Sequence, residues 1–413
     1  MKETKFKDTE IGKIPEEWKM YSIGKDCSVK ARIGWQGLTT SEYLQTGHYG
    51  LITSTDLIEG KVNWDTCVFV SEERYKQDTN IIVKNGDVLV SKDGTIGKVA
   101  VVSNLQYPTT LNSGVFVIRT KNEKITQEGL GLVFISPYFK DFIKRLTAGS
   151  TIVHLYQKDI VNFTFPIPTL PEQHHIASAL TSIDNLIPSL GKLIEKKKNI
   201  KQGAMQQLLT GKIRLKEFTE PWVYRKISEI ATTSSGGTPS RSIPNYYYGD
   251  IKWFTTTELK DNYLYDSVEH ITREALNNSS AKMFSANTIL MAMYGATIGK
   301  LGVLKEPSTT NQACCAIKCN DIVEIFLFYI LLYNRKSIIE KGCGAGQPNI
   351  SQAIVNELSF LVPPCEKEQQ AIANILSKMD NEITALEAKR AKYEVIKQGM
   401  MQQLLTGKIR LIS

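Results

Sequence analysis

The chain has 413 residues, enough for two or three domains with a core each, and its 42% hydrophobic and 22% charged residues are ordinary for a globular protein. No apolar run reaches the roughly 18 residues of a membrane span, and the first residues lack the apolar core of a signal peptide, so we expect a cytoplasmic protein. Seven cysteines, an odd number, argue against a disulfide framework, and the net charge of +8 suits a nucleic-acid-binding protein or a mildly basic protein of another class.

Residues 1–167 form the first predicted domain, a mixed α/β region that we call the first head. Apolar residues run through Asp87–Ser91 and Gly114–Ile118, which predicts two buried partner strands. Gly94 follows the earlier strand and predicts a tight turn. The pattern of Phe134–Leu146 predicts helical structure.

Residues 168–215 predict a long helix after the first head. Glu172 lies in its first turn, where the helix dipole favours an acid, and Gly211 suits a left-handed C-terminal cap. Spacings of four and three alternate along the apolar residues, which predicts the seam of a coiled coil. The seam comprises Ile176, Leu180, Ile183, Ile187, Leu190 and Ile194.

Two features disturb the regularity of this helix. Pro188 lies inside it and is expected to cost about 3 kcal/mol or to kink it. Further along, the seam positions become Lys197 and Lys201, so we expect this end to splay or to pack on another element. Lys196–Lys198 is typical of a solvated face, with contact to a partner subunit or DNA as the alternative.

Residues 216–362 predict a second head, and residues 363–413 a second long helix. Thr288–Ala292 and Ala313–Ile317 predict buried partner strands, and Ile322–Lys341 predicts helical structure. The second helix has a seam in the same phase as the first. This seam comprises Ile372, Leu376, Met379, Ile383 and Leu386.

One phrase of the sequence occurs twice. The sequence of Ile200–Leu215 recurs as Ile396–Leu411, with one difference, Ala204 in the first copy and Met400 in the second. The sequences of the two heads, by contrast, are identical only over a few short stretches. An internal repeat means one structural unit used twice. A whole head between the helices lets the chain return, which favours an antiparallel pair. We therefore predict an α+β fold with a pseudo-two-fold internal repeat, in which two mixed α/β domains are joined by two long helices forming an antiparallel coiled coil.

Catalytic and metal motifs are missing from the sequence. Gly94–Lys98 and Gly295–Lys300 lack the spacing of a phosphate loop and predict tight turns. Cys314, Cys315 and Cys319 have no CxxC pair or histidine beside them, which favours buried thiols over zinc. No Asn- or Asp-Pro-Pro-aromatic tetrapeptide of an adenine methyltransferase occurs. These patterns predict a non-catalytic chain with no metal site.

Several motifs, in a fixed order, carry a resemblance to a known family. They are the Glu10–Trp18 segment, the helix entry Pro168–His174, the Leu-Leu-Thr-Gly-Lys-Ile-Arg-Leu exit of both helices, the Gly236–Ser240 loop and the following Asp250–Trp253. Over essentially its whole length the chain resembles the specificity (S) subunit of type I restriction–modification systems.

The resemblance implies that residues 1–167 and 216–362 are target recognition domains, each reading half of a split, asymmetric sequence in double-stranded DNA. Residues 168–215 and 363–413 would be spacer helices that dock two methyltransferase (modification) subunits, with restriction subunits in the full complex. It implies no cofactor in this chain, with S-adenosylmethionine, ATP and Mg on the partner subunits. The target should not be a palindrome, because the heads differ.

Polar loops in both heads are the predicted DNA contacts, because such side chains reach phosphates and base edges. In the first head the predicted residues are Lys30, Arg32, Ser54, Thr55, Lys92, Thr95, Asn112 and His154. In the second head they are Thr238, Ser240, Arg241, Thr256, Thr257, Tyr294, Thr297, Asn311, Gln347 and Asn349.

Two other functions remain open at this point. The chain could be the DNA-recognition subunit of another modification or defence complex, which the partner that co-purifies with it would decide. A self-sufficient methyltransferase or nuclease is disfavoured by the missing motifs, and methyl transfer by the chain alone would restore that hypothesis.

Overall fold

The computed structural model describes residues 4–148, 154–342 and 349–412. The chain divides into two compact units, the first comprising Met1–Leu190 with Lys389–Ser413 and the second Gly191–Ala388. Each unit therefore combines one head with a part of each long helix.

The first unit contains a four-stranded sheet in the order β10-β9-β12-β4 and a three-stranded sheet in the order β11-β5-β8. These strands are β4 (Cys27–Lys30), β5 (Tyr49–Ile52), β8 (Val68–Val70), β9 (Val88–Ser91), β10 (Val99–Val101), β11 (Thr109–Leu111) and β12 (Val115–Thr120). Three strand pairs accompany them: β1 (Phe6–Thr9) with β2 (Gly12–Pro15), β3 (Lys19–Ser22) with β13 (Thr164–Ile167), and β6 (Leu57–Ile58) with β7 (Lys61–Val62). The α-helices of this head are α1 (Ile23–Asp26), α2 (Glu72–Lys76), α3 (Gln127–Ile135), α4 (Pro137–Thr147) and α5 (Gln157–Ile160).

Strand β9 is buried on both faces and separates two clusters of the core. Val88 and Val90 pack in the cluster that includes α3 and α4, whereas Leu89 packs in the cluster that includes the three-stranded sheet. Alternate side chains of a strand point to opposite faces, so a continuous apolar run suits this position. The two partner strands predicted in the first head are confirmed, with Val90 opposite Phe116 in an antiparallel register.

The helical structure predicted over Phe134–Leu146 is confirmed, but two helices rather than one share this stretch. Helix α3 ends at Ile135 and α4 begins at Pro137. Ser136 between them is extended, with φ −72° and ψ 163°. The ring of a proline disfavours the helical conformation of the residue before it, which explains the break.

The second unit has the same plan. Its five-stranded sheet has the order β15-β22-β19-β20-β17 and its three-stranded sheet the order β18-β16-β21. These strands are β15 (Ala231–Ser235), β16 (Ile251–Phe254), β17 (Asn262–Leu264), β18 (Glu269–Ile271), β19 (Ile289–Ala292), β20 (Leu301–Leu304), β21 (Thr309–Thr310) and β22 (Cys314–Cys319). They are joined by the pair β14 (Val223–Lys226) and β23 (Ser359–Val362), and by α7 (Ile227–Ile230), α8 (Arg273–Asn277), α9 (Glu324–Tyr333), α10 (Arg335–Lys341) and α11 (Gln352–Glu357).

The sequence predicted both the strands and the helical stretch of this head correctly. Strands β19 and β22 pair antiparallel, with Leu290 opposite Ala316. Cys314 and Cys315 are buried in β22, as predicted. The helical structure predicted over Ile322–Lys341 is confirmed, and Asn334, with φ −88° and ψ 7°, ends α9 and starts α10 within it.

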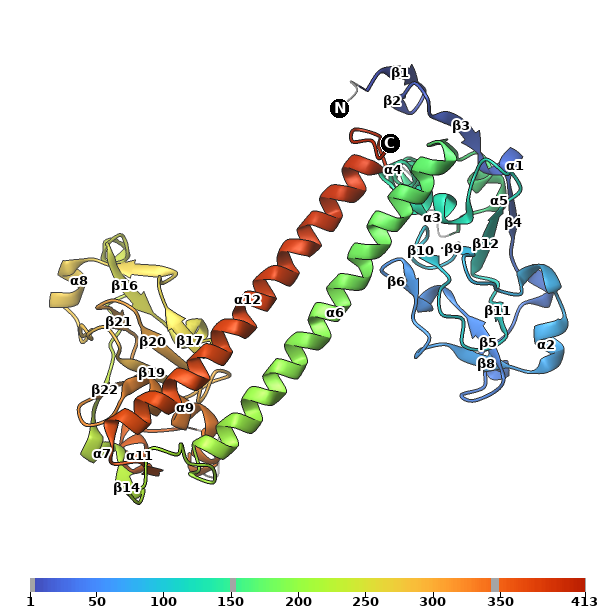
Figure 1. Ribbon diagram of the computed structural model, residues 1–413. Helices are drawn as coiled ribbons and strands as arrows, with labels where there is room; N and C mark the ends of the chain where they lie inside the picture. Colours follow the sequence, from blue (N-terminus) through green and yellow to red (C-terminus); the bar gives the residue numbers. More distant parts are fainter. Residues whose placement is uncertain (1–3, 149–153, 343–348, 413) are drawn as a thin grey trace. The chain divides into compact units, whose positions relative to one another are not determined.

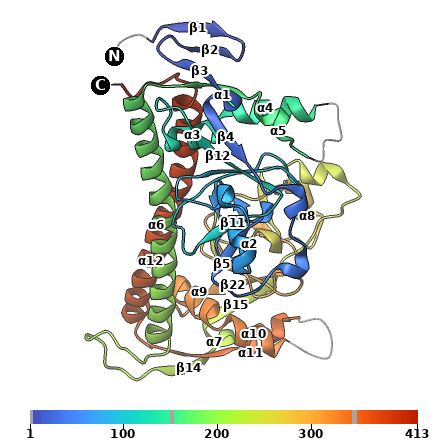
Figure 2. The same ribbon diagram turned by 90° about the vertical axis from the view of Figure 1, so that its right-hand side faces the viewer.

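The two long helices are α6 (Leu170–Leu208) and α12 (Glu366–Leu404), and both views show them side by side (Figure 1, Figure 2). In the first unit Ile176 and Leu180 of α6 pack with Leu404 near the end of α12. In the second unit Met205, near the end of α6, joins the core cluster that holds Ile372 of α12. Early residues of one helix meet late residues of the other in both units, which confirms the antiparallel coiled coil.

The lysines beyond the apolar seam form ion pairs in the second unit. The Lys201 ammonium lies 2.5 Å from the Asp380 carboxylate and 5.3 Å from the centre of the Tyr329 ring of α9. Lys197 pairs with Glu382 at 2.6 Å. This end of α6 therefore does not splay but packs on another element, the second of the two expectations. Lys196 and Lys198 are exposed, as predicted for a solvated face, while Lys197 and Lys198 also pair with acids of α12.

Helix α6 continues through Pro188, whose cost in stability stays a prediction. The predicted caps are confirmed, since Gly211 has φ +68° and Gly407 has φ +70°.

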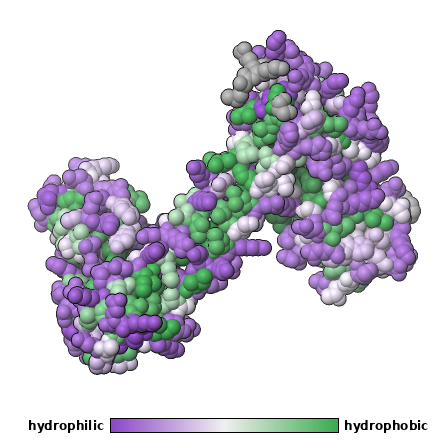
Figure 3. Space-filling view, in the orientation of Figure 1, coloured by the Kyte–Doolittle hydropathy of each residue, from purple (hydrophilic) through white to green (hydrophobic). Residues whose placement is uncertain are grey.

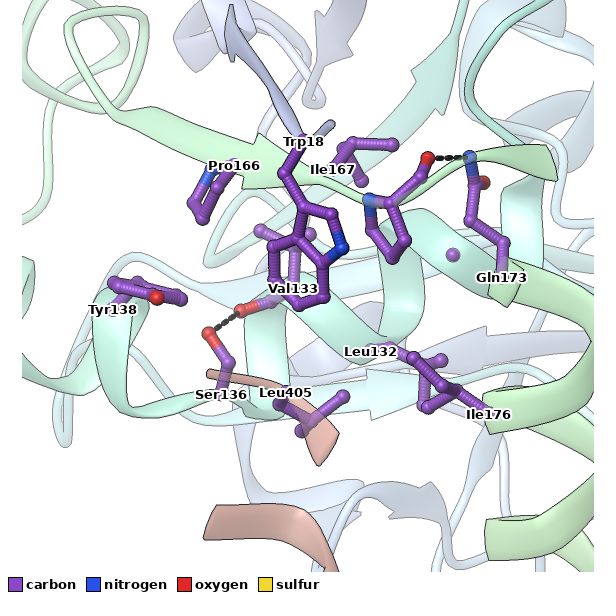
Figure 4. A pocket seen from close by; sticks show the side chains of 12 residues that line it. Trp18, Leu132, Val133, Ser136, Tyr138, Pro166, Ile167, Gln173, Ile176 and Leu405 are labelled. Carbon is purple, nitrogen blue, oxygen red and sulfur yellow. Dashed lines mark hydrogen bonds between the residues drawn. The ribbon is translucent and has the colours of Figure 1, made fainter. Parts of the chain in front are cut away.

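Close to Gly407, Trp18 is 1% exposed and points into a small apolar pocket. Val133 of α3, Ile176 of α6 and Leu405 also line this pocket (Figure 4).

Candidate nucleic-acid interface

The first unit gathers polar loops at one edge of its two sheets. Strands β5 and β11 are parallel, with Ile52 opposite Leu111, so the chain leaves both at the same edge. The backbone N–H of Asn112 donates to the Ile52 carbonyl over 2.9 Å. Ser91 at the end of β9 lies opposite Val115 at the start of β12. Lys30 ends β4 beside Val117 and is exposed.

Ser54 and Thr55 are held at this edge by a short 3₁₀ helix, Ser54–Asp56. The buried carboxylate of Asp56 accepts hydrogen bonds from the Thr53 N–H at 2.7 Å and the Thr53 hydroxyl at 2.8 Å. This reciprocal cap satisfies the free N–H groups of the turn and fixes its direction. Thr55 is exposed and Ser54 half-buried.

Lys92, His154 and Arg32 line one cleft of about 300 Å³ at the same edge. The Lys92 ammonium lies 5.4 Å from the centre of the Phe116 ring. His154 Nδ1 lies 2.6 Å from the Asp93 carboxylate, and both side chains are partly exposed. Thr95 is exposed in the turn that follows β9, where Gly94 has φ +69°.

Arg32 differs from the other predicted contacts because it is only 1% exposed. Its guanidinium donates to the Leu111 carbonyl at 2.9 Å, to Thr110 at 3.2 Å and to Gln77 at 3.1 Å. Burial, followed by the nearby Arg74 charge, lowers the pKa of Arg32. Its donors are occupied within the chain, so it supports the loop after β11, and a contact with DNA would require it to give up these bonds.

The side chain of Asn112 also forms its hydrogen bonds within the chain. Its amide nitrogen donates to the Tyr43 hydroxyl, and its amide oxygen accepts from the Gly114 N–H at 2.9 Å. These bonds shape the turn between β11 and β12. Asn311 follows β21 in the second unit, and its N–H donates to the Phe254 carbonyl at 3.0 Å. The Asn311 amide oxygen is buried and has no hydrogen-bond partner within the described ranges.

The second unit repeats this edge with other side chains. Strands β16 and β21 are parallel, with Phe254 opposite Thr310. Thr256 and Thr257 lie in the 3₁₀ helix Thr256–Glu258, whose Glu258 carboxylate accepts from the Thr255 N–H at 2.7 Å. Thr257 is exposed, whereas Thr256 and Thr297 are half-buried. Tyr294 bridges to Asn349 as Asp93 does to His154.

Thr238, Ser240 and Arg241 follow β15 in a loop packed closely on this edge. The Gly237 N–H donates to the Thr310 carbonyl at 2.8 Å, and a Cβ on Gly237 would lie 2.3 Å from the backbone of Ser280, so only glycine fits. The Thr238 hydroxyl donates to Gln312, and Ser240 lies 2.7 Å from Ser242.

Arg241 is exposed but already paired. Its guanidinium forms two hydrogen bonds with Glu269, at 2.5 and 2.8 Å, and lies 4.1 Å from the centre of the Tyr247 ring. The bonds to Glu269 are the main cause that raises the pKa of Arg241. A bidentate pair of this kind orients the side chain and neutralises its charge.

The structure thus brings most of the predicted residues of each head to one edge. Gln347 lies outside the described residues. The sequence reasoning missed Asp93 and Glu269, the acids that pair with His154 and Arg241, because a carboxylate that pairs with a residue distant in the sequence carries no local signal. The described residues contain no group of three or more His, Cys, Asp or Glu that could hold a metal ion. In the described part of the chain, no helix is both long and apolar enough to cross a membrane.

Each unit has an α/β head with a polar edge, packed on an antiparallel pair of helices. This defines a class of proteins that consist of two copies of one head-and-helix unit. The family model of the type I restriction modification DNA specificity domain matches residues 15–201 and again 219–398. The chain belongs to this family and is a type I restriction–modification DNA specificity subunit. It is the non-catalytic subunit of the complex, and the cofactors belong to the partner subunits.

Similar proteins cover nearly the whole chain. The MjaVIII specificity subunit of Methanocaldococcus jannaschii is 27% identical over 99% of this chain and 97% of its own length. The StySPI specificity subunit of Salmonella potsdam is 21% identical over 88% and 82%. The crystal structure of the S subunit from M. genitalium has a TM-score of 0.59 at 16% identity and covers 94% of this chain and 96% of its own. The HsdS subunit from Thermoanaerobacter tengcongensis has a TM-score of 0.54 at 15% identity, over 96% and 98%. These structures share the fold.

Proposed function

We propose that each head reads one half of a split, asymmetric sequence in double-stranded DNA. The observation that carries this proposal is the pair of equivalent edges, which have one backbone plan and different side chains. Edges that present different donors and acceptors prefer different base pairs, so the two half-sites differ and the target is not a palindrome.

We propose the following domains: target recognition domains at 1–167 and 216–362, and spacer helices at 168–215 and 363–413. The ends of β13 at Ile167 and of β23 at Val362, just before the long helices begin, support these boundaries. Because the proposed ligand is the chromosome, we also propose that the subunit acts in the cytoplasm.

Within the edges, we assign the predicted residues two kinds of role. Exposed lysines and hydroxyl side chains suit phosphates and base edges. Arg32, Asn112 and Thr238 have their polar groups engaged within the chain and hold the loops in place. The residues that we propose as direct contacts are Lys30, Ser54, Thr55, Lys92, Thr95, His154, Ser240, Thr256, Thr257, Tyr294, Thr297, Asn311 and Asn349, and Gln347 and Arg241 stay candidates.

The helices are proposed to dock two methyltransferase (modification) subunits, with restriction subunits joining in the full complex. Ile213 and Ile409 occupy the same position in the repeated phrase and are 55% and 54% exposed. Leu193 and Ile200 of α6 are exposed as well, and hydrophobic residues (green) lie on the surface over the helices in Figure 3. The matching exposed isoleucines in the two copies of the phrase suit two copies of one partner, because the same side chain at the same position can bind the same ligand.

Enrichment of bound DNA tests this function. The full chain, assembled with its modification subunits, is mixed with a pool of random duplex DNA, and the bound fraction is sequenced. We expect two unlike short sequences at a fixed separation, and affinity that falls steeply with salt. A palindromic sequence, or no enriched sequence, would contradict the proposal.

A further inference from the structure

One position in each head combines a fixed backbone with an unlike, exposed pair of side chains. In the first unit Asp93 and His154 form an isolated antiparallel bridge, and in the second unit Tyr294 and Asn349 form the equivalent bridge. We call these the bridge pairs.

Backbone hydrogen bonds around the two bridge pairs correspond one to one. The Leu155 N–H donates to the Lys92 carbonyl at 2.8 Å, and the Ile350 N–H donates to the Met293 carbonyl at 2.7 Å. Leu155 and Ile350 are 1% and 0% exposed, so each anchors its bridge in the core.

The turns that carry the first member of each pair also correspond. Gly94 and Gly295 follow Asp93 and Tyr294 with φ +69° and +81°. Gly97 then donates its N–H to Ser91 at 2.9 Å, as Gly299 does to Ala292 at 2.8 Å. The frame of each bridge therefore rests on backbone bonds, glycines and a buried aliphatic residue, and it does not need a particular side chain at the bridge pair.

The side chains themselves stand at the surface. Asp93 and His154 are 36% and 53% exposed, Tyr294 is 39% exposed, and Asn349 is exposed. The backbone bridge does not depend on the contact between Asp93 and His154, because the second unit forms the same bridge with a tyrosine and an asparagine. The side chains at these positions can therefore differ between the heads without loss of the fold, and they are available to bind a ligand.

The chemistry of both pairs suits base edges. The Asp93 carboxylate would repel a phosphate, but it can accept from the amino group of cytosine or adenine in the major groove. Tyr294 and Asn349 carry no charge and neutralise no phosphate, whereas an asparagine amide matches the edge of adenine. Neighbouring Lys92 is a cation on the first edge that can take the phosphate.

We infer that the bridge pairs, Asp93 with His154 and Tyr294 with Asn349, are equivalent base-reading positions that set part of the specificity of each half-site. This inference rests on the proposed function, that the heads read DNA, and assigns specificity to two positions within it.

Exchange of the pairs tests the inference. D93Y/H154N gives the first head the side chains of the second, and Y294D/N349H does the reverse. Each variant, as the full chain with its modification subunits, selects from a duplex pool in which every position of both half-sites is randomised. E123Q is the matched control, since Glu123 is exposed beyond the opposite end of β12.

For D93Y/H154N we expect a changed base preference at one or two positions of the first half-site, with a roughly ten- to hundredfold loss for the original base. The second half-site should be unchanged, which also shows that the variant has folded. E123Q should alter neither half-site.

Two results would overturn the inference: unchanged base preferences, or an equal loss for all first-half sequences, as expected if the pair only supports the loop. Both differ from a failure of the proposed function itself, in which the unsubstituted chain would select no split sequence at all.

Discussion

Arg410 binds Glu172, which lies 238 residues earlier in the chain, through two hydrogen bonds of 2.6 and 2.8 Å. The indole N–H of Trp18 donates to the same carboxylate at 3.0 Å. The second unit repeats the arrangement, where Arg214 binds Glu368 at 2.7 and 2.8 Å. The second-last residue of each copy of the repeated phrase is thus an arginine that binds the first turn of the other long helix.

Removal of Arg410 should destabilise the first unit markedly. The Glu172 side chain is 0% exposed and that of Arg410 6%, so R410A would leave a buried carboxylate without its cation. Loss of one partner of a buried ion pair costs about 3 kcal/mol or more. Urea unfolding measures the change. K198A is the control, because the exposed pair of Lys198 with Glu387 should contribute at most about 1 kcal/mol. Equal effects of the two variants would refute the role assigned to Arg410.

The two cap glycines should respond unequally to alanine. Both have a left-handed backbone, which costs an L-residue roughly 1–2 kcal/mol. A Cβ on Gly407 would also lie 2.4 Å from the Pro15 ring, whereas a Cβ on Gly211 would meet nothing closer than 3.5 Å. We expect G407A to lower the free energy of unfolding by about 2–4 kcal/mol and G211A by about 1 kcal/mol. Identical losses, measured by urea unfolding, would show that the contact with Pro15 does not matter.

Five thiols should resist alkylation in the native chain. Burial raises the pKa of Cys27, Cys67, Cys314, Cys315 and Cys319 to about 12. The thiolate is the reactive form, so at pH 8 these residues are almost fully protonated, and all except the half-buried Cys319 are shielded as well. Mass spectrometry after iodoacetamide treatment should find them unmodified until urea is added. Fast native labelling of Cys314 or Cys315 would contradict the packing of β22.

Lysines at the first edge should contribute to the salt dependence of DNA binding. We expect K30A and K92A each to reduce the slope of log K against log salt concentration by about 1, because each removes one phosphate contact. E123Q should leave the slope unchanged. R32A should instead lower the stability of the unit, since the Arg32 guanidinium donates to four neighbours within the chain. An unchanged slope for both lysine variants would show that neither Lys30 nor Lys92 contacts a DNA phosphate.

Periodic features of the fold could be predicted from the sequence. The apolar seams of α6 and α12, the cap glycines and the buried strands β9 and β19 follow from local spacing, and the internal repeat implied two equivalent heads. The break between α3 and α4 at Ser136 was not predicted, although the following Pro137 is a local signal for it.

Contacts between distant residues could not be predicted. Glu172 was explained by the helix dipole alone, because nothing local connects it with Arg410. A lysine at the seam position 201 suggests that the packing of the two helices is interrupted there. The partners of its ammonium, Asp380 and Tyr329, come close only in the folded chain. For the same reason, the burial of Arg32 and the pairing of Arg241 with Glu269 were invisible in the sequence.

Exchange of one head tests the central claim most directly. Residues 1–167 are replaced by the corresponding head of another specificity subunit, and the methylated sequences of host DNA are mapped with each chain present. We predict that one half of the split methylated sequence changes while the other half stays the same. Changes in both halves, or in neither, would contradict independent reading by the two heads.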